Sequence, residues 1–552
     1  MTAFKSAANP MMRSAFAETI FNQKYRHEGA ETWGELADTL VNDVCSGLVP
    51  DEVMGAIKEA IREMKFIPGG RYLYYAGRPH RFYNNCYLLK AEEDSREDWA
   101  NLSWKSESCL MTGGGIGADY SIYREAGAVI KRTGGLASGP IPKMMMINEI
   151  GRRVMQGGSR RSAIYASLKW DHPDAKDFLH TKDWFRKIPG TDLTFADVKK
   201  LDFDFPCPLD MTNISLNYDT KWLRDPMTDT FVNNVRQALK SGEPGFSFNF
   251  FHKENETLRN ACTEVVSEDD SDVCNLGSIN LGRIENLREL EIITELAVIF
   301  LLCGGKTAHL PYKKIERVRA KNNRIGLGIM GLHEWLIQRN YKYGMVPELE
   351  RMLITWSGTS ESAANWWSAA LGVARPKGVR AIAPTGTIGL IADTTTGIEP
   401  LFAVAYKRRF LKGTNWNYQY VVDATAQHLI DRYGTDPDTI ETALSLSQDV
   451  ERRIATQASV QDHVDMSISS TINMPAWGTE GNNEGRVMEF AALIARYAPR
   501  LRGLTVYPDG ARGGQPLTPI EYNDAKHMQG HTFEERAHDI CDISGKGGVC
   551  GA

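Results

Sequence analysis

Short apolar runs alternate with helix-like patterns between about residue 80 and residue 510, and this alternation most constrains the fold. The runs with strand character are CYLLK (86–90), ADYSIY (118–123), RIGLGIMGL (324–332), RAIAP (380–384) and GLTVYP (503–508). Strands separated by helices are typical of sheets in which each helix crosses over to the next strand. The sequence therefore predicts an α/β fold, and we find no internal repeat that would indicate another architecture.

The two ends of the chain differ from this central part. Residues 31–48 and 50–64 repeat apolar residues at helical spacing, with Pro50 and Asp51 at a helix start, so residues 1–80 are expected to form a helical region. After about residue 512 the sequence is polar and rich in turn residues, and it ends in CDISGKGGVCGA. We expect residues 516–552 to form a flexible tail.

Charge and hydropathy exclude several classes of protein. Lysine and arginine number 64 and aspartate and glutamate 69, so the net charge is −5, without the basic excess of a nucleic-acid or membrane-surface binder. The N-terminus lacks the apolar segment of a secretory signal. The longest apolar run, 296–303, is far shorter than the roughly 20 residues that span a bilayer. We expect a cytoplasmic protein with no nucleic-acid or membrane partner.

The nine cysteines are scattered, and their number is odd. This is unlike the disulfide framework of a small secreted protein. No CxxC pair and no Cys/His cluster with zinc spacing occurs, so we expect no metal site. Cytosolic thiols, some of them redox-active, are the better interpretation.

One cysteine stands between an amide and a carboxylate. Asn260, Cys262 and Glu264 alternate in NACTE, and Cys274 follows twelve residues after Cys262. Alternate residues share one face of an extended segment, where burying Glu264 would cost desolvation free energy. On spacing alone, a buried inert thiol remains the favoured interpretation, because most isolated cysteines are small core residues.

The wider context changes that interpretation. NACTE followed by VCNLGSINL (273–281) resembles the active-site loop of ribonucleotide reductases. Other stretches resemble the same family in the expected order over about residues 60–520: NNCYLL (84–89), GGLASGPIP (134–142), QGGSRRSA (156–163), NRIGLGIMGLHEWL (323–336), APTGTIGLIADTTTGIEPLF (383–402) and GLTVYPDGARGGQPL (503–517). Each motif is weak alone, but the ordered set is highly specific.

The resemblance implies a ten-stranded α/β barrel over residues 81–515, built from two five-stranded parallel halves that run antiparallel to each other. A finger loop would carry Cys262 into its centre as the thiyl radical. Glu264 would accept the 3′-hydroxyl proton and Asn260 would hold the 2′-hydroxyl or the carbonyl intermediate. Cys86 and Cys274 match the pair that is oxidised to a disulfide during turnover.

Reduction of that disulfide would involve the tail. Cys541 and Cys550 are separated by eight residues, and the resemblance implies that they exchange with the active-site pair before a thioredoxin- or glutaredoxin-like partner reduces them. The family often places these cysteines closer together, so an unpaired tail thiol is a fair alternative.

The remaining assignments concern nucleotides. Small residues and successive backbone N–H groups in PTGTIG would suit an anion, although an ordinary turn has the same composition. The resemblance implies that the substrate phosphates bind at Thr385, Gly386, Thr387 and Ile388. By resemblance, Arg160 or Arg161 contacts the substrate, while Asp94 and Arg124 bind a dNTP or ATP effector. TGGGIGAD (112–119) partly fits a dinucleotide fingerprint, which we reject because a lone match is weak. The phosphate turn favours diphosphate substrates, and a homodimer is a further expectation. Because the chain begins almost at the catalytic core, we expect no overall shut-off by dATP.

The source of the radical divides the family. Members that receive it from a separate metal-containing subunit carry two adjacent tyrosines late in the chain, whereas here Pro508 follows Tyr507. TVY-x-DG is the form seen in adenosylcobalamin-dependent members, so that cofactor is favoured. The alternatives are a catalytic subunit that depends on a radical-generating partner and a non-catalytic nucleotide-sensing scaffold, which would have no need of Cys262 or its neighbours.

Overall fold

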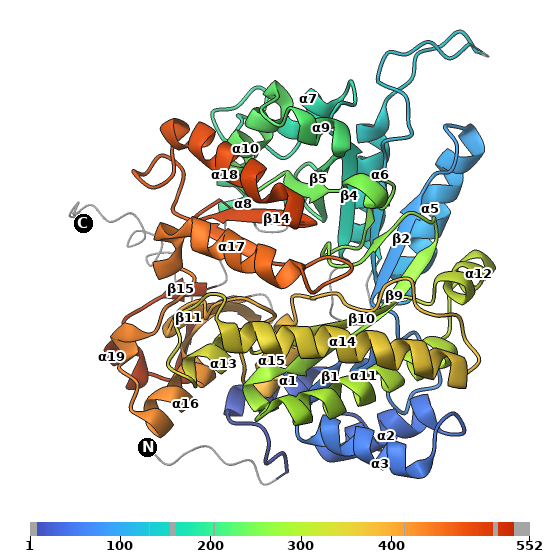
Figure 1. The fold of residues 1–552 in the computed structure, drawn as a ribbon. Coiled ribbons are helices and arrows are strands. Elements are labelled where there is room, and N and C mark those ends of the chain that lie inside the picture. Colours follow the sequence, from blue (N-terminus) through green and yellow to red (C-terminus); the bar gives the residue numbers. More distant parts are fainter. Residues whose placement is uncertain are drawn as a thin grey trace.

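The computed structural model describes residues 8–131, 133–154, 162–202, 205–412, 415–511 and 517–534. None of the helices in these ranges has the length and apolar character needed to cross a membrane. Figure 1 shows a mixed α/β molecule whose sheets lie between helices.

Five parallel strands form the first half of the main sheet. They are β2 (Cys86–Lys90), β3 (Gly115–Asp119), β4 (Ile164–Lys169), β5 (Thr212–Tyr218) and β6 (Gly245–Phe248), paired in chain order. The helices between them are α5 (Arg96–Met111), α6 (Pro140–Arg153), α7 (Ala175–His180), α8 (Phe195–Leu201), α9 (Thr220–Arg224) and α10 (Asp229–Ser241). These strands are almost wholly buried. Helices cover one face of this half-sheet, and residues 258–267 pack against β2 and β3 on the other.

The second half runs antiparallel to the first at both edges. β9 (Asp272–Asn280) pairs antiparallel with β2 and parallel with β10 (Ile325–Met330), while β14 (Gly503–Pro508) pairs antiparallel with β6 and parallel with β13 (Thr471–Met474). Between β10 and β13 lies the segment 380–382. It makes two isolated parallel bridges, Leu327↔Arg380 and Ile382↔Ile468.

The expected α/β class is confirmed, but the sheet differs from a closed ten-stranded ring. Its tenth strand is β1 (Phe66–Pro68), an addition at the edge of β9, and the segment 380–382 is bridged without forming a strand. RAIAP pairs with each neighbouring strand through a single residue, so it does not form a strand of its own. The closed barrel and its strand count therefore stay predictions.

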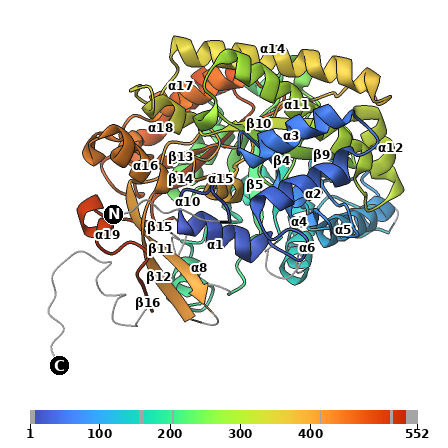
Figure 2. The same cartoon turned by 90° about the horizontal axis from the view of Figure 1, so that it is seen from below.

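The N-terminal helices are part of the same hydrophobic core. α2 (Trp33–Cys45) begins at a capping box between Thr32 and Glu35, and α3 (Asp51–Arg62) turns its apolar face inward. Both pack against α11 (Leu287–Thr307), which lies beside α14 (Pro347–Ala370), as Figures 1 and 2 show. The first 75 residues also contain α1 (Ala15–Lys24) and α4 (Gly70–Tyr75).

A smaller sheet lies beside the main one (Figure 2). Its order is β15 (Leu517–Pro519), β11 (Ala405–Lys412), β12 (Asn415–Val422) and β16 (Thr532–Glu534). Part of the expected tail thus forms β15, α19 (Tyr522–Lys526) and β16, whereas residues 535–552 lie outside the described chain. The remaining helices are α12 (Lys313–Asn322), α13 (Leu332–Ile337), α15 (Gly386–Ala392), α16 (Ala424–Tyr433), α17 (Val450–Gln461) and α18 (Val487–Tyr497).

Candidate active site

A short hairpin carries the NACTE motif. β7 (Leu258–Arg259) and β8 (Val266–Ser267) pair antiparallel, so residues 260–265 form the loop between them. β7 packs against β2 and β3 of the main sheet. The approach is close because β3 is rich in glycine: a Cβ at Gly117 would lie 1.9 Å from the Arg259 carbonyl oxygen. Gly115 and Gly117 of TGGGIGAD therefore make room for this finger hairpin.

Arg259 anchors the finger hairpin. Its buried guanidinium donates to Asn249 Oδ1 at 2.7 Å and to the Arg502 carbonyl oxygen at 3.1 Å. Burial, followed by repulsion from Arg502, lowers the pKa of Arg259 to about 9. Next to it, Thr257 donates its hydroxyl to Asp119 Oδ2 at 2.6 Å. These contacts fix the hairpin to β3, β6 and the start of β14, and sequence reasoning missed them.

Two cysteines face each other across the first antiparallel edge. Cys86 of β2 is the register partner of Cys274 of β9, although 188 residues separate them in the chain. Opposite residues of antiparallel strands have Cα atoms about 4.5–5.5 Å apart, within the roughly 7 Å that a disulfide requires. Both thiols are buried and free. The strand register therefore gives this pair a geometry in which a disulfide can form.

The amide and the carboxylate of the motif lie beside Cys86. Asn260 Nδ2 donates to Cys86 Sγ at 2.9 Å, and Asn260 Oδ1 accepts from the Val265 backbone at 2.9 Å. Cys86 Sγ donates to Glu264 Oε1 at 3.8 Å. Asn260 and Glu264 are 2% and 1% exposed. The hairpin thus brings both polar side chains onto the cysteine pair.

Cys262 occupies the tip of the same loop. It is partly exposed, whereas the other six cysteines in the described chain are buried. Thr263 after it has a left-handed backbone (φ 71°), and Asn213 Nδ2 donates to the Ala261 carbonyl oxygen at 3.2 Å. The sulfur is close enough to Cys86 to help raise the pKa of that thiol. Cys262 therefore lies by the buried pair and remains reachable from outside.

Burial controls the protonation of this site. It raises the pKa of Cys86 and Cys274 well above that of an ordinary thiol, with Glu264 adding to the rise at Cys86. Both side chains therefore remain S–H groups near neutral pH and suit hydrogen donation better than thiolate attack. Burial also raises the pKa of Glu264 to about 7, against opposing hydrogen bonds from Asn260, its own backbone and Cys86. Its Oε2 has no hydrogen-bond partner in the described chain.

The predicted phosphate turn begins α15. Thr385 is the N-cap with a left-handed backbone (φ 51°), and its hydroxyl accepts from the Gly397 backbone at 2.8 Å. Gly386 is exposed, Thr387 is half-buried and Ile388 is buried. The exposed start of the helix leaves room for a phosphate, although the helix is short.

The other end of α15 is held by the N-terminal region, a contact that the sequence did not reveal. Asp393, the C-cap, accepts from the Arg13 backbone at 2.7 Å and from the Ser14 hydroxyl at 2.5 Å. Burial raises the pKa of Asp393 to about 6. Since α1 also packs on α15, the start of the chain supports the predicted phosphate turn.

The predicted effector residues lie together at the surface. Arg124 Nε and Asp94 Oδ2 form an ion pair at 2.5 Å near the start of α5, so an effector would have to exchange with this contact. Arg160, Arg161, Cys541 and Cys550 lie outside the described residues.

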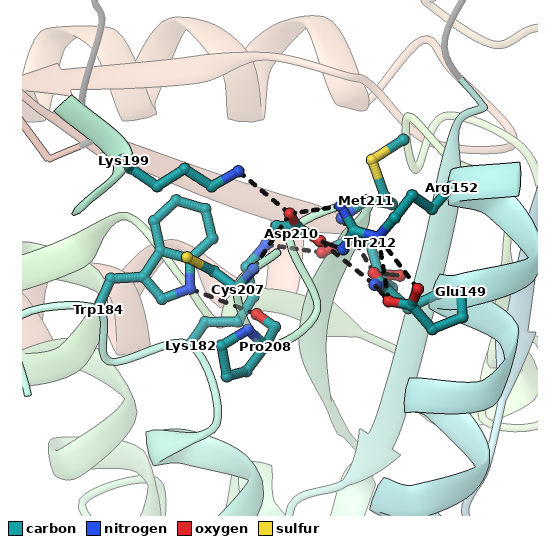
Figure 3. A network of polar contacts seen from close by, with 11 residues as sticks. Glu149, Arg152, Lys182, Trp184, Lys199, Cys207, Pro208, Asp210, Met211 and Thr212 are labelled. Atoms are coloured by element: carbon teal, nitrogen blue, oxygen red, sulfur yellow. Dashed lines mark hydrogen bonds and ion pairs between the residues drawn. The ribbon is translucent and has the colours of Figure 1, made fainter. Parts of the chain in front are cut away.

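A buried carboxylate that sequence reasoning missed, Asp210, lies in a network of polar contacts between α6 and β5 (Figure 3). Asp210 accepts from Arg152 Nη1 at 3.1 Å, Lys199 Nζ at 3.2 Å, Asn148 Nδ2 at 3.3 Å and the Cys207 backbone at 3.3 Å. Burial alone would raise the pKa of Asp210, but these donors hold it below its usual value. The network joins the end of α6, the helix that precedes β4, to the start of β5, the strand that pairs with β4.

Comparison with known proteins identifies the family. The sequence matches the family described as ribonucleotide reductase, barrel domain, over residues 84–187, 234–352 and 355–507. The chain belongs to the ribonucleotide reductase family.

Its relatives narrow the comparison. A vitamin B12-dependent ribonucleoside-diphosphate reductase of Mycobacterium tuberculosis is 27% identical over 92% of this chain and 80% of the relative. One of Thermoplasma acidophilum with the same description is 26% identical over 84% of this chain and 66% of the relative. The solved class Id alpha subunit of Actinobacillus ureae has the same fold, with a TM-score of 0.70 at 15% identity, over 90% of this chain and 97% of that one.

Proposed function

We propose that this chain reduces ribonucleotides, with diphosphates favoured, to 2′-deoxyribonucleotides by thiyl-radical chemistry at Cys262. The observation that carries the proposal is the cluster of Cys86, Cys274, Asn260 and Glu264 around the finger hairpin that bears Cys262. A nucleotide-sensing scaffold has no use for a buried carboxylate and two protonated thiols in this arrangement.

The residues divide the reaction among themselves. Cys262, as a thiyl radical, abstracts the 3′-hydrogen of the ribose, while Glu264 accepts the 3′-hydroxyl proton. The unpartnered Oε2 of Glu264 is available for that hydrogen bond. The radical at C3′ makes loss of the 2′-hydroxyl easier, and the Asn260 amide holds the oxygen substituents during this change. Cys262 finally returns a hydrogen atom to C3′, and Glu264 returns its proton to the 3′-oxygen.

The cysteine pair supplies the electrons. One thiol hydrogen leaves with the 2′-hydroxyl as water and the other replaces it at C2′, so Cys86 and Cys274 end as a disulfide. Two electrons and two hydrogens thus pass from the pair to the substrate for each product. A thioredoxin- or glutaredoxin-like reductant, acting through Cys541 and Cys550, would restore the thiols.

The structure supports adenosylcobalamin as the source of the radical. The sulfur of Cys262 is reachable from outside while the other described cysteines are buried, as an external radical generator requires. β14 carries Tyr507 followed by Pro508, not a pair of tyrosines. When bound, the cofactor supplies the one-electron oxidation that converts the Cys262 thiol to a thiyl radical. The names of the curated relatives agree with this choice.

An assay of the purified chain alone tests this function. With a ribonucleoside diphosphate, a dNTP effector and a dithiol, we expect deoxyribonucleotide to form only when adenosylcobalamin is added, as measured by chromatography of the products. Activity that required a second metalloprotein instead would favour the partner-dependent alternative and overturn the cofactor assignment. No reduction under either condition would contradict the function itself.

Glu264 gives the reaction a defined pH dependence. Because its pKa is raised to about 7, the carboxylate that acts as base is depleted below that pH. We expect the reduction rate to rise about tenfold between about pH 6 and pH 8. The free energy of unfolding should change in the opposite direction. Because the folded state binds this proton more tightly than the unfolded chain, the stabilisation that Glu264 contributes falls as the pH rises from about 4.5 to about 7. A Glu264→Gln variant should lose this rise of rate with pH. An unchanged pH–rate profile in the variant would mean that another group titrates.

Effector binding and assembly belong to the same proposal. Asp94 and Arg124 lie by the start of α5, and an effector there would act on a site distinct from the substrate. The neighbouring helices α5 and α6 expose Trp104 (55%), Met111 (65%) and Met146 (50%). Such apolar side chains on adjacent helices fit an interface with a second copy. We also include in the proposal that the bridges through residues 380–382 complete a ten-stranded barrel.

A further inference from the structure

A cavity of about 440 Å³ lies between the end of β6 and the chain that leads into β14. Residues 248–253 after β6, the end of α17 with the segment that follows it, and the chain before β14 surround it. Its cationic side chains are Lys253, Arg380, Arg500 and Arg502, and its carboxylates are Asp462 and Asp465. None of these residues takes part in the radical chemistry proposed above.

The carboxylates in this cavity are already engaged. Asp462 pairs with Arg500 at 2.5 Å. Asp465 accepts from the Val379 and Arg380 backbones at 2.7 and 2.8 Å, and its side chain lies 3.4 Å from Arg380 Nε. Asp462 therefore offsets Arg500, while Asp465 is shared among Arg380, Lys253 and Arg502.

Lys253 and Arg502 share two nearby carboxylates, Glu256 and Asp465. Arg502 Nη2 donates to Glu256 Oε2 at 2.9 Å, while its Nε and Nη1 have no hydrogen-bond partner in the described chain. Arg502 is 6% exposed, and Lys253 Nζ donates to the Asp465 carbonyl oxygen at 3.3 Å. Behind them lies the buried guanidinium of Arg259. Three clustered cations, Lys253, Arg502 and Arg259, with two nearby carboxylates leave positive charge uncompensated, which is costly in a buried setting.

The effect of this clustering is visible at Lys253. Burial and then repulsion by Arg502 lower the pKa of Lys253, and burial lowers the pKa of Arg502. A bound anion would reverse these effects, because it would offset the repulsion between the two side chains. The rim adds an aromatic group: Phe251 is 63% exposed and has a left-handed backbone (φ 56°), a conformation that bulky residues rarely adopt without a functional reason.

We propose that this cavity binds the phosphate group of a small anion, held by Lys253 and Arg502 with Phe251 at the rim. The proposal is independent of the radical chemistry and of its cofactor. A phosphate supplies two negative charges and several acceptor oxygens, which match an ammonium and a guanidinium with free donors. An aromatic rim would further favour a phosphate that carries a nucleoside base.

The chemical reactivity of Lys253 tests the site. A lysine with a lowered pKa is acylated faster than an ordinary one, so a trace of an amine-reactive acylating reagent followed by peptide mass spectrometry reports on Lys253 directly. We expect inorganic pyrophosphate to slow labelling of Lys253 at least about fivefold, while exposed Lys342 on the same chain is unaffected. Sodium chloride at the same ionic strength should not reproduce the protection.

Two variants and a second ligand sharpen the result. Arg502→Gln removes the guanidinium with free donors and should raise the pyrophosphate concentration needed for protection by about tenfold. Tighter protection by ADP than by pyrophosphate, lost in Phe251→Ala, would assign a nucleotide; equal protection would assign a simple phosphate anion. The proposal is wrong if no phosphate ligand protects Lys253, or if Lys342 is protected equally.

Discussion

Cys262→Ser is expected to abolish nucleotide reduction while leaving the protein folded. A hydroxyl cannot take the place of a thiol as hydrogen-abstracting radical, so we expect a loss on the order of 10⁴-fold or more, as for other essential reacting groups. The dissociation constants of substrate and effector should change by less than about twofold, because Cys262 lies partly exposed at a loop tip and contributes little to the hydrophobic core. Product chromatography and equilibrium nucleotide binding measure the two effects.

The matched control is a cysteine outside the site. Cys45 is buried in α2, among the N-terminal helices. Cys45→Ala should retain turnover with at most a modest loss of stability from the missing sulfur. If Cys262→Ser turned over at the rate of the parent chain, the thiyl radical could not be on Cys262.

The second large effect is expected from a glycine that touches no substrate. In Gly117→Ala, the new Cβ would stand 1.9 Å from the Arg259 carbonyl oxygen, a backbone atom that cannot rotate away. We expect the finger hairpin to shift, with a destabilisation of about 3 kcal/mol. A displacement of about 1 Å at the reacting groups costs on the order of 100-fold in rate. Thermal unfolding and reduction assays measure the two losses.

Gly55→Ala is the control for this variant. Gly55 lies in α3 with no atom near the position of a new Cβ, so alanine should be neutral or stabilise the helix by up to about 1 kcal/mol. Normal activity and stability in Gly117→Ala would mean that the hairpin does not depend on the glycines of β3.

Local pattern predicted the strands that pair over several residues. CYLLK is β2 and GLTVYP is β14, residue for residue, whereas ADYSIY overlaps β3 only at its first two residues. RAIAP failed as a strand because only single bridges hold it. Closure of a sheet depends on such long-range contacts, which apolar periodicity does not encode.

The site was predictable only in part. The spacing of Asn260, Cys262 and Glu264 alone favoured an inert thiol. Family resemblance indicated the roles of these residues and of Cys86 and Cys274. The supporting residues had no local signal: Arg259 donates to the carbonyl of Arg502, 243 residues later, and Ser14 bonds Asp393 across 379 residues. The glycines of β3 resembled a nucleotide fingerprint, yet they serve close packing. Contacts of this kind become visible only when the chain is folded.

The most direct test of the radical mechanism is a single turnover without external reductant. Reduced protein is mixed with substrate, effector and adenosylcobalamin, quenched, alkylated and mapped by mass spectrometry. We expect one disulfide between Cys86 and Cys274 for each deoxyribonucleotide formed, before any exchange with the tail. Product that appears while both thiols remain alkylatable and no tail disulfide has formed would contradict the account.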